Sequence, residues 1–256
     1  MPCSKKIYAT FLIIFFFPTS FAKAQEQRAP DLHEGEVHAT LIDAEIVDPR
    51  NYPAVVLLEM YGAMCTATIV GPRTILSAGH CAAQGGSGTF RVKGRSYKAQ
   101  FKVPASYNFE RSYPNDADVA LGYVATDILE VKPYSVTSRL PLVQTSVTLF
   151  GYGCAVANGF ADGRLRRGPS EVARVSNRSF VLQKAGNSAK GCPGDSGGPS
   201  FAVVSGQIRQ MGVHARANSF DRTIDTRLDT PEIQEFFSAY TKQQRTRICG
   251  FNTVCN

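Results

Sequence analysis

Short runs of β-branched and aromatic residues recur along most of this chain, and turns containing glycine or proline separate them. From Leu41 onward the turn signals include Gly71-Pro72, Gly85-Gly86 and Asn158-Gly159. Many short strands in succession, each needing neighbours to bury its apolar face, predict an antiparallel β-sandwich or barrel. The predicted strands are 54–60, 65–70, 74–77, 89–92, 97–103, 119–123, 146–152, 171–177, 179–183, 200–204, 207–214 and 223–226.

One helix is predicted after the last of these strands. Thr230 is a good N-cap, Pro231 suits the first helical position, and Glu232 and Glu235 in the early turns favour the helix dipole. The apolar residues that follow recur at helical spacing and predict a buried face. They are Ile233, Phe236, Phe237 and Tyr240.

The first residues have the pattern of a secretory signal peptide. Lys5 and Lys6 precede an apolar run at 7–17, and Ala22-Lys23-Ala24 is a small-x-small cleavage site, so residues 1–24 are the expected leader. An uncleaved anchor is the alternative, but the run is shorter than the roughly 20 residues that a spanning helix needs. We therefore expect a secreted or periplasmic protein with no membrane association after cleavage. The polar stretch 25–40 is predicted to be a pro-segment or an N-terminal arm.

The cysteines fit an exported protein. Of the seven, Cys3 leaves with the leader and six remain, an even number that allows complete pairing in 15 ways. There is no CxxC motif and the histidines are scattered, so no metal site is predicted.

Charge gives little support for a nucleic-acid partner. Losing the three leader lysines lowers the net charge from +7 to +4, and no basic run interleaves with aromatic residues. No cofactor is predicted, and no acidic loop suggests a calcium site. The oligomeric state does not follow from the sequence.

Three motifs carry the chemistry. "GCPGDSGGP" surrounds Ser196 with glycines that permit positive φ, "LSAGHC" contains His80, and "NDADVALGYV" contains Asp118 before an apolar strand. A serine hydroxyl is a weak nucleophile and needs an adjacent base, which a histidine oriented by a carboxylate supplies. Asp116 is a rival for the carboxylate.

In these motifs and their order the sequence resembles the chymotrypsin/trypsin-like serine proteases, from about Leu41 to the C-terminal helix. The resemblance implies an all-β fold of two antiparallel Greek-key six-stranded β-barrels with a C-terminal helix. The barrels would cover about 41–135 and 136–229, with a helix and tail at 230–256, and the connection 125–144 as their boundary. It implies a serine endopeptidase that acts on peptide or protein substrates in the cleft between the barrels.

The resemblance also assigns roles. His80 would be the general base, Asp118 its orienting carboxylate and Ser196 the nucleophile, with the backbone N–H groups of Gly194 and Ser196 as the oxyanion hole. We prefer Asp118 to Asp116 because it directly precedes a strand, Val119-Ala120-Leu121, as the family's acid does.

The same resemblance suggests the disulfides. Cys65–Cys81 matches the bridge that closes the histidine loop. Cys192 occupies a family position whose usual partner on the far pocket wall is missing here, so we pair it with Cys154 in "FGYGCAV". Cys249 and Cys255 are left to each other.

The chain departs from the family at its start. Members usually begin with Ile-Val-Gly-Gly after a basic residue, and the new ammonium pairs with the acid before the serine, here Asp195. The sequence around Leu41 contains neither the preceding basic residue nor the Gly-Gly pair. Three possibilities stay open: cleavage after Thr40 by a non-tryptic enzyme, an internal cation that serves Asp195 in a single chain, or a chain that never matures.

The pocket also departs. Lys190 stands where trypsins carry an acid, and His214 stands where some bacterial glutamyl endopeptidases of this fold have a histidine. The pair suits an acidic P1 side chain, although Asp225 could pair with Lys190 instead. Thr223 replaces a glycine, which would make the pocket shallow. Ala215, Arg216 and Ala217 are expected to offer backbone groups to an extended peptide.

Two other functions compete. The altered start and pocket wall would fit a catalytically silent binding protein on a protease scaffold. An esterase or lipase is disfavoured, because the serine motif is not a G-x-S-x-G elbow and the residue order is not Ser–Asp–His.

Overall fold

The computed structural model describes residues 44–82, 85–108, 117–154, 161–183, 191–217 and 222–255. The expected leader, the arm at 25–40, the chain start near Leu41, Asp116 and Lys190 lie outside the described residues.

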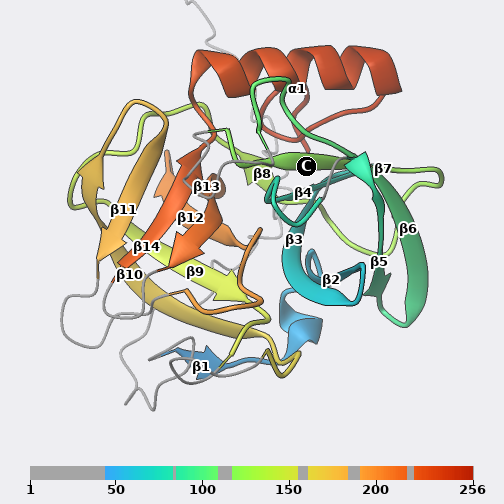
Figure 1. The fold of residues 1–256 in the computed structure, drawn as a ribbon, viewed down its shortest axis with the longest axis horizontal. Helices are drawn as coiled ribbons and strands as arrows, with labels where there is room; N and C mark the ends of the chain where they lie inside the picture. The colour runs from blue at the N-terminus through green and yellow to red at the C-terminus, as the bar shows by residue number, and fades with distance from the viewer. Residues whose placement is uncertain are drawn as a thin grey trace, which may run out of the picture. The chain divides into compact units, whose positions relative to one another are not determined.

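Six antiparallel strands close the first barrel in the order β2-β3-β4-β7-β6-β5 (Figure 1). Burial alternates on β5 and β6: on β6, Tyr97, Ala99 and Phe101 are buried while Lys98 and Gln100 are exposed, as expected when successive side chains point to opposite faces. The strands are β2 (Val55–Met60), β3 (Ala63–Gly71), β4 (Thr74–Ser77), β5 (Ser87–Val92), β6 (Arg95–Lys102) and β7 (Ala120–Val124).

The second barrel closes because β9 pairs with both β12 and β10 at the ends of the path β10-β11-β14-β13-β12-β9. Two additional strands of two residues each join it: β1 pairs with β10, and β8 runs parallel to β13. Such short strands show no period in the sequence and were not predicted. The bounds are β1 (Glu45–Ile46), β8 (Ser135–Val136), β9 (Ser146–Gly151), β10 (Arg166–Val175), β11 (Ser179–Gln183), β12 (Pro199–Val204), β13 (Gln207–Ala217) and β14 (Arg222–Arg227).

The two-barrel prediction is therefore confirmed, with several strands longer than expected, among them β10 and β13 near the site. β10 begins at Arg166 rather than Glu171, because the polar Arg-Arg-Gly-Pro stretch has no apolar alternation. β13 continues past His214 to Ala217, with a bulge between His214 and Arg216 opposite β14. Both extensions bring arginines toward the site described below.

The predicted helix α1 (Pro231–Gln244) is present, with Thr230 as its N-cap. The Thr230 hydroxyl accepts a hydrogen bond from the Ile233 N–H at 3.4 Å. Ile233, Phe237 and Tyr240 join the core cluster of the first barrel, and Phe236 packs at its margin. The helix is therefore held mainly by this apolar face. Among the described residues, no helix has the length and apolar character needed to cross a membrane.

Replacing Phe237 with alanine should lower the free energy of unfolding by about 3–5 kcal/mol, because the ring is fully buried and leaves a cavity. Its edge contacts the Phe251 ring, with centroids 5.7 Å apart. Urea unfolding of Phe237→Ala measures the loss. Phe236→Ala is the matched control and should lose clearly less, since Phe236 is only half-buried; equal losses would contradict the packing argument.

Three disulfides join the cysteines in the pairs that the sequence suggested. Cys65–Cys81 links β3 to the turn after β4, and Cys249–Cys255 closes the C-terminal tail. Cys154–Cys192, with Cα atoms 5.5 Å apart, ties the end of β9 to the loop that contains Ser196.

Candidate active site

His80 and Asp118 meet because the strands next to them are paired. β4 ends just before the His80 turn, β7 begins just after Asp118, and Ser77 is the ladder partner of Ala120. Each oxygen of the Asp118 carboxylate contacts one nitrogen of His80. Oδ2 lies 2.8 Å from the ring Nδ1, and Oδ1 accepts a hydrogen bond from the His80 backbone N–H at 2.8 Å. Asp118 is buried and the His80 ring is 38 % exposed. The carboxylate thus fixes the ring and leaves Nε2 without a carboxylate partner.

The Ser196 loop lies directly against the segment that contains His80. Ser196 O accepts from Thr66 N–H at 2.8 Å, and Cys81 Sγ lies 3.7 Å from the same oxygen. A Cβ at Gly197 would fall 2.1 Å from Ser77 Oγ, so this contact requires glycine. In the described chain no hydrogen bond joins the Ser196 hydroxyl to the His80 ring, and in unliganded proteases this bond is often long.

Two backbone amides in this loop have no acceptor. The N–H groups of Asp195, Gly197 and Gly198 are all hydrogen-bonded. Those of Gly194 and Ser196, which alternate with them, donate to no group in the part of the chain that is described. Gly194 has φ +97° and Gly197 has φ +84°, conformations that favour glycine. Unpaired amides are rare in folded proteins, and a pair beside one serine is suited to binding an oxyanion.

The Asp195 carboxylate is buried behind this loop. Oδ1 accepts from Gly153 N–H and Oδ2 from Cys192 N–H, each at 2.8 Å. Burial raises the pKa of Asp195 to about 7, although the two N–H groups and the charges of His214 and Arg166 act to lower it. Asp195 therefore joins two loops beneath the unpaired amides.

A cavity of about 270 Å³ opens beside Ser196. Thr223 closes one side, and its hydroxyl accepts from Gly191 N–H at 2.6 Å. Arg216 is the only Lys or Arg among the lining residues; it is half-buried and, in the described part of the chain, makes no ion pair. The lining residues are Gly191, Cys192, Pro193, Asp195, Ser196, His214, Arg216, Ala217 and Thr223.

His214 and Asp225 differ from their expected roles. Asp225 is fully buried behind the cavity, where it accepts from the Ser200 hydroxyl at 2.5 Å and lies 2.8 Å from His214 Nδ1. Burial disfavours the charged ring, but the Asp225 carboxylate, together with the charge of Asp195, raises the pKa of His214 above its ordinary value. The other ring nitrogen, Nε2, is also buried. A substrate side chain in the cavity therefore meets no exposed nitrogen of His214.

The backbone of β13 beyond His214 has one open edge. β14 pairs with one side as far as Ala217, and His214 exchanges backbone hydrogen bonds with Gly197 and Gly198 on the other side. From Ala215 onward no described strand pairs with that second side. Ala215, the bulged residue, is buried and does not line the cavity.

The model of the trypsin family matches residues 42–223, most of the chain. This chain belongs to the trypsin family. Neuropsin, a serine protease of mouse brain, has a similar structure with a TM-score of 0.64 at 16 % identity, covering 79 % of this chain and 98 % of that one. A Glu endopeptidase has a TM-score of 0.62 at 21 % identity, covering 78 % and 97 %. No curated protein sequence matches this one closely enough to count as a relative.

As a member of the trypsin family, the protein is a serine endopeptidase of two-barrel fold. Within the described residues, no group of His, Cys, Asp or Glu side chains is arranged to hold a metal ion.

Two residues that lie near the site, Tyr107 and Arg166, were not predicted from the sequence. Tyr107 packs against Gly79, next to His80, and burial and the Asp118 charge raise its pKa. Arg166 is fully buried near Asp195. The only available signal for Arg166 was its position opposite Gly151, which requires the strand register.

Proposed function

We propose that this protein is an exported serine endopeptidase that uses Ser196 as nucleophile, His80 as general base and Asp118 to orient His80. The observation that carries the proposal is the pair of unpaired Gly194 and Ser196 amides next to a histidine already held by a buried carboxylate. Neither feature alone suffices, since His214 and Asp225 form a second histidine–aspartate pair that lies buried.

The proposed reaction is acyl transfer followed by hydrolysis. The Ser196 hydroxyl attacks the peptide carbonyl and gives its proton to His80 Nε2, while Asp118 stabilises the imidazolium through Nδ1–H. The carbonyl oxygen becomes an oxyanion and accepts hydrogen bonds from Gly194 and Ser196 N–H. His80 then protonates the leaving amine, and water releases the acyl group by the same steps in reverse order. The open edge of β13 would hold the substrate as an added strand.

Labelling with a fluorophosphonate tests the proposal against the alternative of a silent binding protein. We expect one label per chain, attached to Ser196, because labelling requires an activated serine. Ser196→Ala should abolish labelling, whereas Ser200→Ala, which changes another serine nearby, should retain it. An unlabelled but folded wild-type protein would favour the binding protein.

We further propose that the enzyme prefers acidic over basic side chains at P1. Among the described residues that line the cavity, Asp195 is the only acid, and both of its oxygens are engaged by backbone N–H groups. Arg216 is a cation without an ion-pair partner there among the described residues, and Lys190 precedes the lining residue Gly191 in the sequence. The similarity to a Glu endopeptidase is compatible with this preference. Because both His214 nitrogens are buried, the proposed P1 contact is made by Arg216, with Lys190 as a second candidate from its place in the sequence.

Arg216→Ala should lower kcat/KM for substrates with P1 glutamate by about 10–100-fold, the cost of losing hydrogen bonds to a charged group. Substrates with an uncharged P1 residue should change much less. A peptide library with varied P1 residues measures both. Arg209→Ala is the matched control, since Arg209 lies on the same strand away from the cavity. Dominant cleavage after Arg or Lys by the wild-type enzyme would contradict the proposed preference.

Export is proposed from the leader, and the three disulfides fit an oxidising compartment. N-terminal sequencing of the protein recovered outside the cytoplasm should show that residues 1–24 are missing. A chain that retains Met1 in that compartment would contradict the proposed cleavage.

A further inference from the structure

Asp195 lies between the two unpaired amides in sequence and connects two loops in space. One oxygen holds Gly153 and the other holds Cys192. A Cβ at Gly151 would fall 2.0 Å from Asp195 Oδ1, and one at Gly153 would fall 2.6 Å from Asp195 Cγ, so the carboxylate sits closely against both glycines. A buried carboxylate of this kind needs compensating charge or dipoles to stay ionised.

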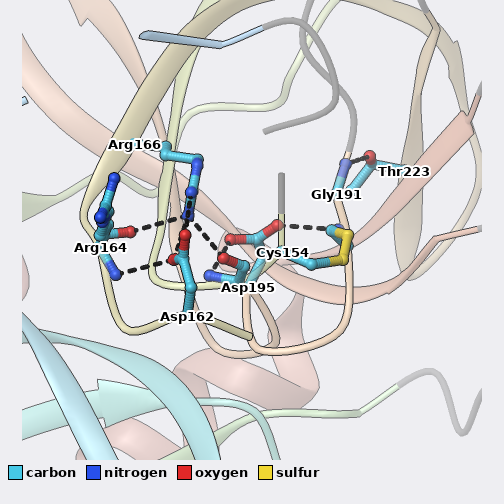
Figure 2. The surroundings of a disulfide bond; sticks show 9 residues. Cys154, Asp162, Arg164, Arg166, Gly191, Asp195 and Thr223 are labelled. Carbon is cyan, nitrogen blue, oxygen red and sulfur yellow. Dashed lines mark hydrogen bonds and ion pairs between the residues drawn. A yellow bond between two sulfur atoms is a disulfide. The ribbon is translucent and has the colours of Figure 1, made fainter. Parts of the chain in front are cut away.

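Arg166 supplies a positive charge near Asp195, and Figure 2 shows its side chain with those of Asp162 and Asp195. Its side chain is 1 % exposed, and Nη1 donates to Gly153 O at 2.7 Å. The Gly153 peptide thus accepts from Arg166 through its carbonyl group and donates to Asp195 through its N–H. Hydrogen bonds in such a chain polarise one another, so the guanidinium strengthens the donor that holds Asp195.

Asp162 fixes the guanidinium in this orientation. Its carboxylate accepts from Arg166 Nη1 at 2.7 Å and from Nη2 at 2.5 Å, a two-point pairing. Asp162 is partly exposed, and its hydrogen bonds with Arg166 lower its pKa to about 2, so it is ionised at neutral pH. Arg166 is therefore paired and cannot rotate away from Gly153 without breaking this contact.

The disulfide adds a covalent link between the same two loops. Cys154 follows Gly153, and its partner Cys192 provides the second N–H that holds Asp195. The two N–H groups that donate to the Asp195 carboxylate are therefore each held in position: that of Cys192 by the disulfide to Cys154, and that of Gly153 by Arg166.

We propose that Arg166, acting through the Gly153 peptide and held by Asp162, is the internal cation that keeps Asp195 and the Gly194 and Ser196 amides in the arrangement that binds the oxyanion. Catalysis then does not require a new amino terminus. Arg166 is a positioning residue, since it contacts neither Ser196 nor the cavity. The inference rests on the oxyanion role proposed above.

Arg166→Gln tests the proposal in the exported protein. We expect kcat to fall about 10²-fold, as on loss of an oxyanion-hole donor, with KM changed much less. Affinity for a peptide boronic acid, which mimics the tetrahedral state, should fall in parallel. Arg166→Lys should recover part of the activity. The matched control is Arg167→Gln, on the next residue, whose side chain pairs with Glu45 and Tyr52 at the surface; it should keep wild-type kcat.

The pH profile separates positioning from a purely structural role. The ionised Asp195 accepts both N–H groups, and Arg166 favours the ionised form, so removing Arg166 should raise the pKa of Asp195 above about 7. The acidic limb of kcat/KM should therefore move to higher pH in Arg166→Gln. The other charged groups near Asp195 are His214, with Asp225 behind it, which this variant leaves in place. Asp162 loses its arginine partner in this variant, and its unpaired carboxylate acts in the same direction on the pKa of Asp195.

Active-site titration with the fluorophosphonate distinguishes the possible failures. If the wild type is not labelled, the proposed function fails. If the wild type is labelled and folded Arg166→Gln keeps the same kcat and labelling rate, only the Arg166 proposal fails. If Arg166→Gln does not fold, Asp162→Asn is the deciding variant, because it keeps the arginine but weakens its pairing. A wild-type kcat in Asp162→Asn would overturn the proposal. A reduced kcat with a partial shift of the pH profile would support it.

Blocking the chain start provides an independent check. Leu41→Pro should prevent cleavage after Thr40, and mass spectrometry can show that the amino terminus is not released. We expect this chain to keep wild-type kcat per titrated site. Activity that appears only after cutting near Leu41 would overturn the proposal.

Discussion

Ser196→Ala is expected to lower kcat by about 10⁶-fold, because it removes the nucleophile from a group that acts as a unit. The remaining rate above the uncatalysed reaction would come from the Gly194 and Ser196 amides and from substrate binding. The Ser196 hydroxyl makes no hydrogen bond among the described residues, so the melting temperature should not change. Turnover of a peptide substrate by purified protein, together with thermal unfolding, measures both effects.

Ser200→Ala is the control for this prediction. Ser200 is buried on β12 and donates to Asp225 Oδ2 at 2.5 Å. Losing that bond should reduce stability while leaving kcat close to the wild-type value. If Ser200→Ala abolished turnover and Ser196→Ala did not, the assignment of the nucleophile would be wrong.

Asp118→Asn is expected to lower kcat by about 10⁴-fold with little change in fold. The asparagine oxygen can still accept from the His80 backbone N–H, but its amide group now donates toward Nδ1. Nδ1 must then act as acceptor, so the ring proton moves to Nε2, which can no longer take the proton of Ser196. Steady-state kinetics measures the loss. A single-turnover acylation assay should place it in the acylation step.

Asp225→Asn provides a matched comparison, since Asp225 holds His214 Nδ1 at the same 2.8 Å distance. This second pair is buried, and among the described residues it hydrogen-bonds neither the His80 ring nor the Ser196 hydroxyl, so its loss should reduce stability by about 3–5 kcal/mol with a much smaller effect on kcat. A loss of kcat in Asp225→Asn as large as in Asp118→Asn would indicate that the wrong pair had been chosen.

Local patterns predicted most of the fold. Alternating burial on strands such as β6 and the cap and apolar face of α1 were visible in the sequence, because each depends on residues close together in the chain. Strand ends were less accurate where pairing rather than pattern extends the strand, as at Arg166 on β10 and Ala217 on β13. The two-residue strands β1 and β8 have no local signal.

In the pocket, the sequence position of a residue did not predict the direction of its side chain. Placing His214 on the strand at the cavity was correct, but the orientation of its ring depends on Asp225 from β14 and on the contact between β12 and β13. Those contacts direct both ring nitrogens into the interior. Arg216, named only for its backbone, instead provides the cation at the cavity.

By itself the sequence determined the family and the strand-rich architecture, and it supplied His80, Asp118 and Ser196 as the candidate catalytic residues, since motifs with fixed local conformations contain them. Only the tertiary structure decided which charges lie next to one another: Asp225 with His214, and Arg166 with Asp162 behind Gly153. The physical reason is that electrostatic and hydrogen-bond energies depend on distances through space and on burial, and closing a barrel brings together residues whose separation in the chain gives no indication of either.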